Sequence, residues 1–186
     1  LFGSVTGAAA LATDIENGFF DRLLLSPSTR SGILIGRLAG SAIFGAAQSL
    51  IFILLLLPFN APVKSGIVGI VALSISGGIV ALAIGAIMSS VAIRTGSAEA
   101  VQGAFPLLFV LLFFSSAFFP RETMTGAYKR IADINPISHL VEGMRTLVLD
   151  GFDLQALAKT LFIPSAICVV AVALALTQLR RRINAE

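Results

Sequence analysis

The chain has 186 residues, of which 56% are hydrophobic and only 12% are charged, whereas soluble domains carry about 25% charged residues. A water-soluble protein of this size cannot bury so much apolar surface. A disordered chain would need low hydrophobicity, and a nucleic-acid-binding protein would need a dense basic patch. Neither is present, so the composition predicts a polytopic membrane protein, and the helix-length apolar stretches described next make its predicted fold class all-α.

Four uncharged stretches are long enough to cross a bilayer, whose hydrocarbon core of about 30 Å needs about 20 helical residues. The predicted spans are residues 33–57, 66–93, 100–119 and 160–179, and in the first of them the uncharged stretch begins at Leu38, directly after Arg37. Residues 1–13 are apolar but too short to span alone, so we expect them to be the end of a truncated span. A re-entrant segment would give the same pattern.

Alternation of these spans assigns each connection to a side. Residues 14–37, 94–99 and the tail 180–186 lie on one side, and residues 58–65 and 120–159 lie on the other. Basic residues divide almost equally between the two sides, but Arg180, Arg181 and Arg182 directly abut a span. The positive-inside rule therefore favours a cytoplasmic location for the first side.

Small residues recur every four positions and predict faces where helices pack closely. These residues are Gly32, Gly36 and Gly40; Ser41, Gly45 and Ser49; and Gly77, Ala81, Gly85 and Ser89.

Residues 14–30 predict a short amphipathic helix on the cytoplasmic side. Asp14 is a suitable cap, Ser26-Pro27 would end the helix, and Asp21 and Arg22 would form its polar face. The apolar face would consist of Phe19, Phe20, Leu23 and Leu24. Two interpretations are open: a loop that rests these side chains in the membrane interface, or a docking surface for a cytoplasmic partner.

Residues 120–151 predict a pair of interfacial or re-entrant helices on the outer side. Asn135-Pro136 begins the second helix, because Asn is a good cap and Pro is favoured in the first turn. This helix, of about fourteen residues, is too short to span a bilayer. Its apolar face comprises Ile137, Leu140, Val141, Met144, Leu147 and Val148, opposite Ser138, Glu142 and Arg145.

Few polar groups lie within the predicted spans. Gln48, Ser115 and Ser116 could contact a transported substrate or form hydrogen bonds between helices. Phe105, Phe109 and Phe113 could line an apolar path, pack on a neighbour or face lipid. Outside the spans, Glu142 and Arg145 are spaced to pair on one helix turn, and His139 is expected to be a hydrogen-bonded group at the interface.

No acidic or basic side chain lies inside the uncharged stretches 38–57, 66–93, 100–119 and 160–179, which argues against an ion-coupled transporter. The chain has no phosphate-binding loop, nucleophile elbow or metal-binding helix, and a single cysteine, Cys168, cannot form a multi-cysteine metal site. We therefore expect no catalytic residue, metal or cofactor on this chain.

Two motifs carry a specific resemblance. Residues 16–30 read ENGFFDRLLLSPSTR and are followed by Gly36-Arg37. Later in the chain come SSAFFP at 115–120, INP at 134–136 and EGMR at 142–145. Over essentially its whole length the sequence resembles the permeases of type-2 ABC exporters, and most closely their daunorubicin-type drug-resistance branch.

This resemblance implies a six-span domain preceded by an interfacial elbow helix, of which this chain would be the C-terminal portion. The first motif would be the coupling helix, which seats in a separate ATP-binding subunit that carries ATP and magnesium. Its contact residues would be Glu16, Gly18, Phe19, Phe20, Asp21, Arg22, Leu23, Leu24, Pro27 and Arg30. The second motif would be the external hairpin, with Pro120, Asn135, Pro136, Glu142 and Arg145.

The resemblance also implies a function. Two permease copies in a bacterial cell membrane would export amphipathic drug- or lipid-like cargo by alternating access. The lipid bilayer and the ATP-binding subunit would be the other partners, and nucleic acid would not be one. Two alternatives remain open: export of polysaccharide by the same architecture, and a membrane scaffold that transports nothing.

Overall fold

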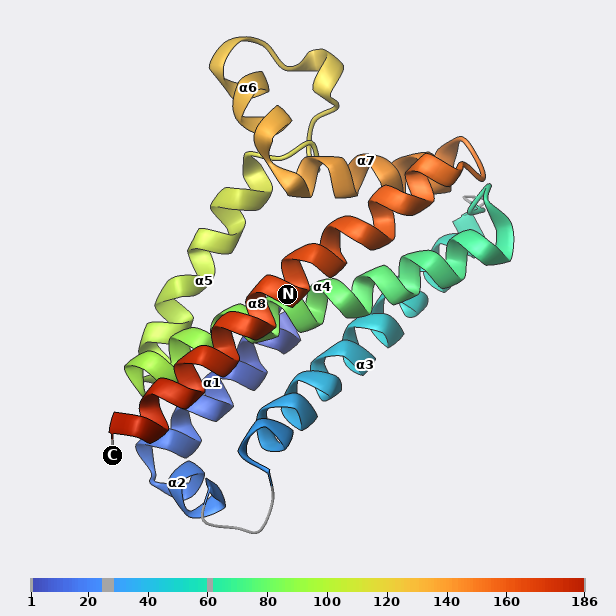
Figure 1. Ribbon diagram of the computed structural model, residues 1–186. Coiled ribbons are helices and arrows are strands. Elements are labelled where there is room, and N and C mark those ends of the chain that lie inside the picture. The colour runs from blue at the N-terminus through green and yellow to red at the C-terminus, as the bar shows by residue number, and fades with distance from the viewer. Residues whose placement is uncertain (1, 25–28, 60–61, 186) are drawn as a thin grey trace. The chain divides into compact units, whose positions relative to one another are not determined.

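The computed structural model describes residues 2–24, 29–59 and 62–185, and every regular element in these residues is helical (Figure 1). This confirms the predicted all-α class. The helices are α1 (Phe2–Glu16), α2 (Phe19–Leu24), α3 (Arg30–Leu56), η1 (Leu57–Phe59), α4 (Gly66–Thr95), α5 (Ala98–Phe113), η2 (Arg121–Thr123), α6 (Gly126–Ile134), α7 (Pro136–Leu149) and α8 (Leu154–Ala185).

Three of the described helices are long and apolar enough to cross a membrane: Ser31–Leu56, Gly66–Thr95 and Leu154–Ile183. The prediction of a fourth span at residues 100–119 is wrong in length, because α5 ends at Phe113. Its 16 residues rise about 24 Å at 1.5 Å per residue, less than the hydrocarbon core of about 30 Å.

The boundaries of α8 also differ from the prediction. The helix begins at Leu154 and continues through Arg180, Arg181 and Arg182, so the expected tail is helical as far as Ala185. Charged residues mark where a helix meets water, but they do not end it, because Lys and Arg are good helix formers.

The chain divides into two compact units. Unit 1 contains residues 1–46, 77–105 and 165–186, and unit 2 contains residues 47–76 and 106–164. Every connection expected on the cytoplasmic side falls in unit 1, and every connection expected on the outer side falls in unit 2. The division into units thus groups the connections in the same way as the alternation of spans does.

In unit 1, small residues bring α3 and α4 into close contact. A Cβ atom added to Gly45 would lie 2.3 Å from Ala81 Cβ and 2.8 Å from the Gly77 carbonyl oxygen. A Cβ atom on Gly85 would lie 3.3 Å from Ser41 Oγ. The predicted packing of these two small-residue faces is therefore confirmed, and Ser4 Oγ of α1 adds a 2.9 Å hydrogen bond to the Ala81 carbonyl oxygen.

The earlier glycines of α3 behave differently. A Cβ atom on Gly36 or Gly40 would meet nothing within 4 Å, and one on Gly32 would meet only Thr29. The predicted packing face formed by these glycines is therefore not used by the described part of the chain.

In unit 2, α7 packs against its neighbours at several points. Met144 and Val148 contact a buried cluster of Ile53, Val63 and Leu73. The backbone amides of residues 64 and 65 donate to the carbonyl oxygens of residues 148 and 147, at 3.0 and 3.2 Å.

One hydrogen bond in unit 2 compensates for a proline inside a helix. Pro164 lies within α8 and has no N–H, so the carbonyl oxygen of Thr160 loses its usual helical donor. Ser76 Oγ of α4 donates to that oxygen at 2.7 Å. The bond satisfies a buried acceptor and fastens α4 to α8.

Candidate functional site

The candidate coupling segment begins at a sharp corner between α1 and α2 (Figure 1). Asp14 and Glu16 belong to the last turn of α1, and α2 begins only at Phe19. The prediction that Asp14 caps the amphipathic helix is therefore wrong. Gly18 makes the corner with φ +66°, a conformation that favours glycine.

The two phenylalanines of α2 have opposite environments. Phe19 is 53% exposed, whereas Phe20 is completely enclosed by the chain's own atoms. No part of the Phe20 side chain is accessible in this structure, and its contact with a partner stays a prediction. Leu23 is half-buried and Arg22 is exposed, while Pro27 and the side chains of Asp21, Leu24 and Arg30 lie outside what the structure describes.

Two acidic residues at the end of α1 tie this corner to other helices of unit 1. Asp14 Oδ2 accepts a hydrogen bond from Arg37 Nη1 of α3 at 2.6 Å. Glu16 Oε1 accepts from the backbone N–H of Ala98, the first residue of α5, at 2.9 Å. Glu16 is therefore an N-cap supplied from another helix, in addition to its predicted place in the coupling segment.

Removal of the Glu16 acceptor is expected to loosen the start of α5. Helix caps contribute about 1 kcal/mol, and a carboxylate at a helix N-terminus adds a favourable interaction with the helix dipole. Glu16→Ala should raise amide hydrogen exchange at residues 98–101, whereas Glu16→Gln, which keeps an oxygen acceptor, should retain most of the protection. Equal exchange in the two variants would contradict the cap.

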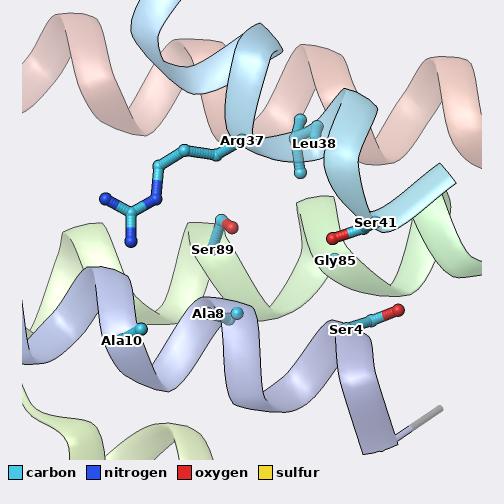
Figure 2. Close-up of a pocket in the computed structure, with 9 residues that line it drawn as sticks. Ser4, Ala8, Ala10, Arg37, Leu38, Ser41, Gly85 and Ser89 are labelled. Carbon is cyan, nitrogen blue, oxygen red and sulfur yellow. The ribbon is translucent and has the colours of Figure 1, made fainter. Parts of the chain in front are cut away.

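Arg37, which pairs with Asp14, lines a cavity within unit 1. It measures about 180 Å³, and its walls come from α1, α3 and α4 (Figure 2). The lining residues are Ser4, Gly7, Ala8, Ala10, Arg37, Leu38, Ser41, Gly85 and Ser89. Four of its lining residues, Ser4, Arg37, Ser41 and Ser89, have polar side chains, and the others are glycine, alanine or leucine.

The candidate path residues fall into two groups. Gln48 is exposed in the middle of α3, Phe109 is half-buried, and Phe113 is 53% exposed and stacked on Phe118 with ring centroids 4.8 Å apart. A role for these three residues in a substrate path stays a prediction.

Ser115 and Ser116 are instead fully buried and hydrogen-bonded within the chain. Ser115 Oγ donates to the Leu112 carbonyl oxygen at 2.5 Å, and Ser116 Oγ donates to the Ser138 carbonyl oxygen at 3.1 Å. The structure thus shows the hydrogen-bonding alternative for these serines, and a role for them in a substrate path stays a prediction.

In the outer hairpin, defined as residues 120–151, the predicted start of α7 is confirmed. Asn135 is the N-cap and Pro136 is the first residue of the helix, and Asn135 Oδ1 accepts from Ile137 N–H at 3.0 Å. Pro120 immediately precedes η2, and its carbonyl oxygen accepts from Thr123 Oγ1 at 2.7 Å. His139 Nε2 lies 3.0 Å from the Asp133 carbonyl oxygen, in agreement with a hydrogen-bonded surface group.

The expected Glu142–Arg145 pair is replaced by longer-range contacts. Glu142 Oε1 lies 2.5 Å from Arg121 Nε, and Arg121 Nη1 lies 3.6 Å from Asp133 Oδ1. Arg145 Nη2 donates to the Ser116 carbonyl oxygen at 2.9 Å. Glu142 thus connects α7 to Arg121 of η2, and Arg145 connects α7 to the segment that follows α5.

A family model described as "ABC-2 family transporter protein" matches residues 1–177. The chain belongs to the ABC-2 transporter family. The match includes both α2 and the outer hairpin, the two segments on which the sequence resemblance rests. It therefore confirms the predicted type-2 ABC permease architecture.

Two curated relatives of this ABC-2 chain carry drug-resistance names. The daunorubicin resistance ABC transporter permease protein DrrB1 of Streptomyces coeruleorubidus is 31% identical over 148 residues, which are 78% of this chain and 52% of that protein. The probable doxorubicin resistance ABC transporter permease protein DrrC of Mycobacterium tuberculosis is 25% identical over 174 residues, 91% of this chain and 63% of that protein.

The chain therefore spans between about half and two thirds of the length of these relatives. No solved structure matches it significantly. Both relatives are bacterial and, together with the three long apolar helices, they support a bacterial membrane protein.

Several residues that organise this ABC-2 chain were missed in the sequence. A clue existed for Arg37, because a charge inside a long apolar helix needs a partner and Asp14 is a nearby acidic residue. Tyr128 and Ser138 gave no such signal, because their hydrogen bonds are to backbone atoms far away in sequence.

Proposed function

We propose that this chain is part of the membrane-spanning permease of an ATP-driven exporter that moves amphipathic drug- or lipid-like cargo out of a bacterial cell. The observation that carries the proposal is the short helix α2, which is anchored inward by Phe20 and presents Phe19 outward. The family match and the names of the relatives support it. The absence of charged residues from the centres of the long helices favours apolar cargo and an external energy source.

In this proposal a separate cytoplasmic subunit binds and hydrolyses ATP with magnesium, and the chain itself is not an enzyme. Phe19 and Arg22 are the described exposed residues of α2, and an exposed aromatic side chain beside an arginine is typical of a binding surface. We propose that Phe19 inserts into the ATP-binding subunit and that Arg22 contributes at the rim. Two permease copies in the bilayer would enclose the transport path.

The contacts at the end of α1 suggest how movement of α2 reaches α3 and α5. Asp14 is bonded to α3 and Glu16 to the start of α5, and only the short corner around Gly18 separates them from α2. Closure of the ATP-binding subunits would push α2, and these two contacts would pass the displacement to α3 and α5. The outcome would be alternation between inward-open and outward-open states.

The test is cargo efflux by the intact permease, co-reconstituted into proteoliposomes with its ATP-binding subunit. Daunorubicin is the probe. We expect ATP-dependent loss of daunorubicin from wild-type vesicles. Phe19→Asp should reduce co-purification of the ATP-binding subunit and efflux by at least tenfold, because a carboxylate replaces an exposed aromatic anchor; a tenfold loss corresponds to about 1.4 kcal/mol.

Phe152→Asp is the matched control, since Phe152 is 59% exposed and lies in unit 2 on the connection between α7 and α8. It should bind the subunit and transport as the wild type does. Efflux of a polysaccharide but not of daunorubicin would show that the cargo is a polysaccharide and not a drug-like molecule. No efflux of either cargo, with the subunit bound equally by wild type and Phe19→Asp, would favour a scaffold.

A further inference from the structure

The outer end of α5 is closed by side chains from the outer hairpin. The last four carbonyl groups of a helix lack intrahelical donors and need other partners. In α5 the last regular bond reaches Val110, whose carbonyl oxygen accepts from Phe114 N–H at 3.0 Å. The carbonyl oxygens of residues 111–114 follow, and every one of them accepts a hydrogen bond from a side chain.

Asn135 provides two of these four bonds. Its Nδ2 group donates to the carbonyl oxygens of Leu111 and Phe114, at 2.8 and 3.1 Å. Tyr128 Oη donates to the Phe113 carbonyl oxygen at 2.5 Å, and Ser115 Oγ donates to the Leu112 carbonyl oxygen. Helix α5 ends here because the carbonyl oxygens of residues 111–114 already accept hydrogen bonds from these side chains.

The same Asn135 amide begins α7, because its Oδ1 atom caps the helix. One buried side chain, 8% exposed, therefore ends α5 and starts α7 with its full set of donors and acceptor in use. In Figure 1 the end of α5 (lime) meets the start of α7 (orange).

A second layer of contacts fixes the same junction. Ser116 N–H donates to Ser138 Oγ, Ser116 Oγ donates to the Ser138 carbonyl oxygen, and Arg145 donates to the Ser116 carbonyl oxygen. Ser116 and Ser138 are fully buried. Polar contacts that are buried and fully satisfied are costly to break, because each separated group would lose its partner without gaining water.

The opposite end of α7 is fixed to the rest of unit 2. Its carbonyl oxygens at 147 and 148 accept from the backbone at 64 and 65. Gly143 approaches α8 so closely that a Cβ atom there would lie 2.9 Å from both the Ala156 carbonyl oxygen and Thr160 Oγ1. Helix α7 therefore holds α5 at its beginning and α4 and α8 along its later turns.

From this geometry we infer that α7 is a brace that keeps the outer ends of α4, α5 and α8 in one rigid body, and that Asn135 is the positioning residue that joins α5 to it. One consequence of the inference rests on the proposed transport function. The outer end of the transport path would open between two copies of the chain, and not by separation of α5 from α8 within one copy. Neither the family match nor the names of the relatives assign such a role to Asn135.

The brace is tested by distances between spin labels. The labels replace Leu107 of α5 and Ile67 of α4, which are 64% and 80% exposed, in the intact permease with Cys168→Ser. Electron–electron double resonance is recorded in nanodiscs with the ATP-binding subunit, first without nucleotide and then with ATP and vanadate. We expect one narrow distance distribution that is the same in both states.

Asn135→Asp separates the two roles of the residue. A carboxylate still accepts from Ile137 N–H and caps α7, but it faces the carbonyl oxygens of Leu111 and Phe114 without donors. The distance distribution should become at least twice as broad, while amide exchange in α7 stays near the wild-type level. Ser138→Ala, which removes one acceptor of the second layer, should broaden it less.

Three results would overturn the inference: a wild-type distance that changes between the two states, an Asn135→Asp distribution as narrow as the wild type, or loss of α7 protection together with the broadening. If Asn135→Asp does not insert into the membrane, the inference is tested by the wild-type distances in the two nucleotide states and by the width of the Ser138→Ala distribution. The nucleotide-free measurement needs no transport, so failure of efflux leaves the test of the brace intact.

Discussion

Gly45→Ala is expected to destabilise the packing of α3 on α4 although it adds only one methyl group. The new Cβ atom would lie 2.3 Å from Ala81 Cβ and 2.8 Å from the Gly77 carbonyl oxygen, so the two helices must move apart. Overpacking of this kind costs about 1–3 kcal/mol. Thermal unfolding in detergent and the yield of inserted permease measure the effect.

Gly40→Ala is the matched control on the same helix. Its Cβ atom meets nothing within 4 Å, and alanine is favoured over glycine in a helix by up to about 1 kcal/mol. This variant should unfold at the wild-type temperature or above it. Opposite signs for the two substitutions would show that steric contact, and not the loss of a glycine, is responsible.

A double variant that moves the methyl group from residue 81 to residue 45 tests the contact between these two residues directly. Ala81→Gly opens the space that the added Cβ atom of Gly45→Ala would occupy, so the double variant should recover a substantial part of the lost stability. Recovery should be incomplete, because the Gly77 carbonyl oxygen stays 2.8 Å away. Strict additivity of the two single effects would mean that residues 45 and 81 do not touch.

The small-residue faces were predictable because helical periodicity places every fourth residue on one side, and close packing needs small side chains there. The same rule failed for Gly36 and Gly40, since periodicity does not reveal which face finds a neighbour. The start of α7 was predictable for a related reason: Asn135-Pro136 combines a cap and a first-turn proline within two adjacent residues.

The end of α5 could not be predicted in this way. High hydropathy continues through Phe119, and no glycine or proline lies between Pro106 and Pro120. The helix stops because Asn135 and Tyr128, far along the chain, supply donors to its final carbonyl groups. Termination there is a tertiary effect, and a window of local sequence does not contain it.

Local pattern also misjudged the coupling segment. Phe19 and Phe20 are adjacent apolar residues, and periodicity alone assigned both to one exposed face. The corner at Gly18 rotates α2 so that one ring lies inside unit 1 and the other outside. The candidate docking surface is therefore smaller than predicted. Phe20 anchors α2 to unit 1, and Phe19 is the side chain available for contact with a partner.

Phe20→Ala is accordingly expected to have the largest effect of the alanine substitutions at the described side chains of α2. The side chain is fully buried, and truncation of a buried phenylalanine costs about 3–5 kcal/mol. A helix of six residues has little stability of its own, so α2 should detach from α1. Amide exchange at residues 19–24 should rise to that of an open segment, and ATP-dependent efflux should fall at least tenfold.

Comparison with Phe19 identifies the cause. Phe19→Ala should leave exchange in α2 near the wild-type level, because that side chain is 53% exposed, and should weaken only the binding of the ATP-binding subunit. Phe20→Leu, which keeps most of the buried volume, should restore much of the efflux that Phe20→Ala loses. If Phe20→Ala instead retains low exchange in α2 while subunit binding is lost, Phe20 makes a partner contact after all. The buried anchor and the exposed contact are therefore distinguishable by two measurements on adjacent residues.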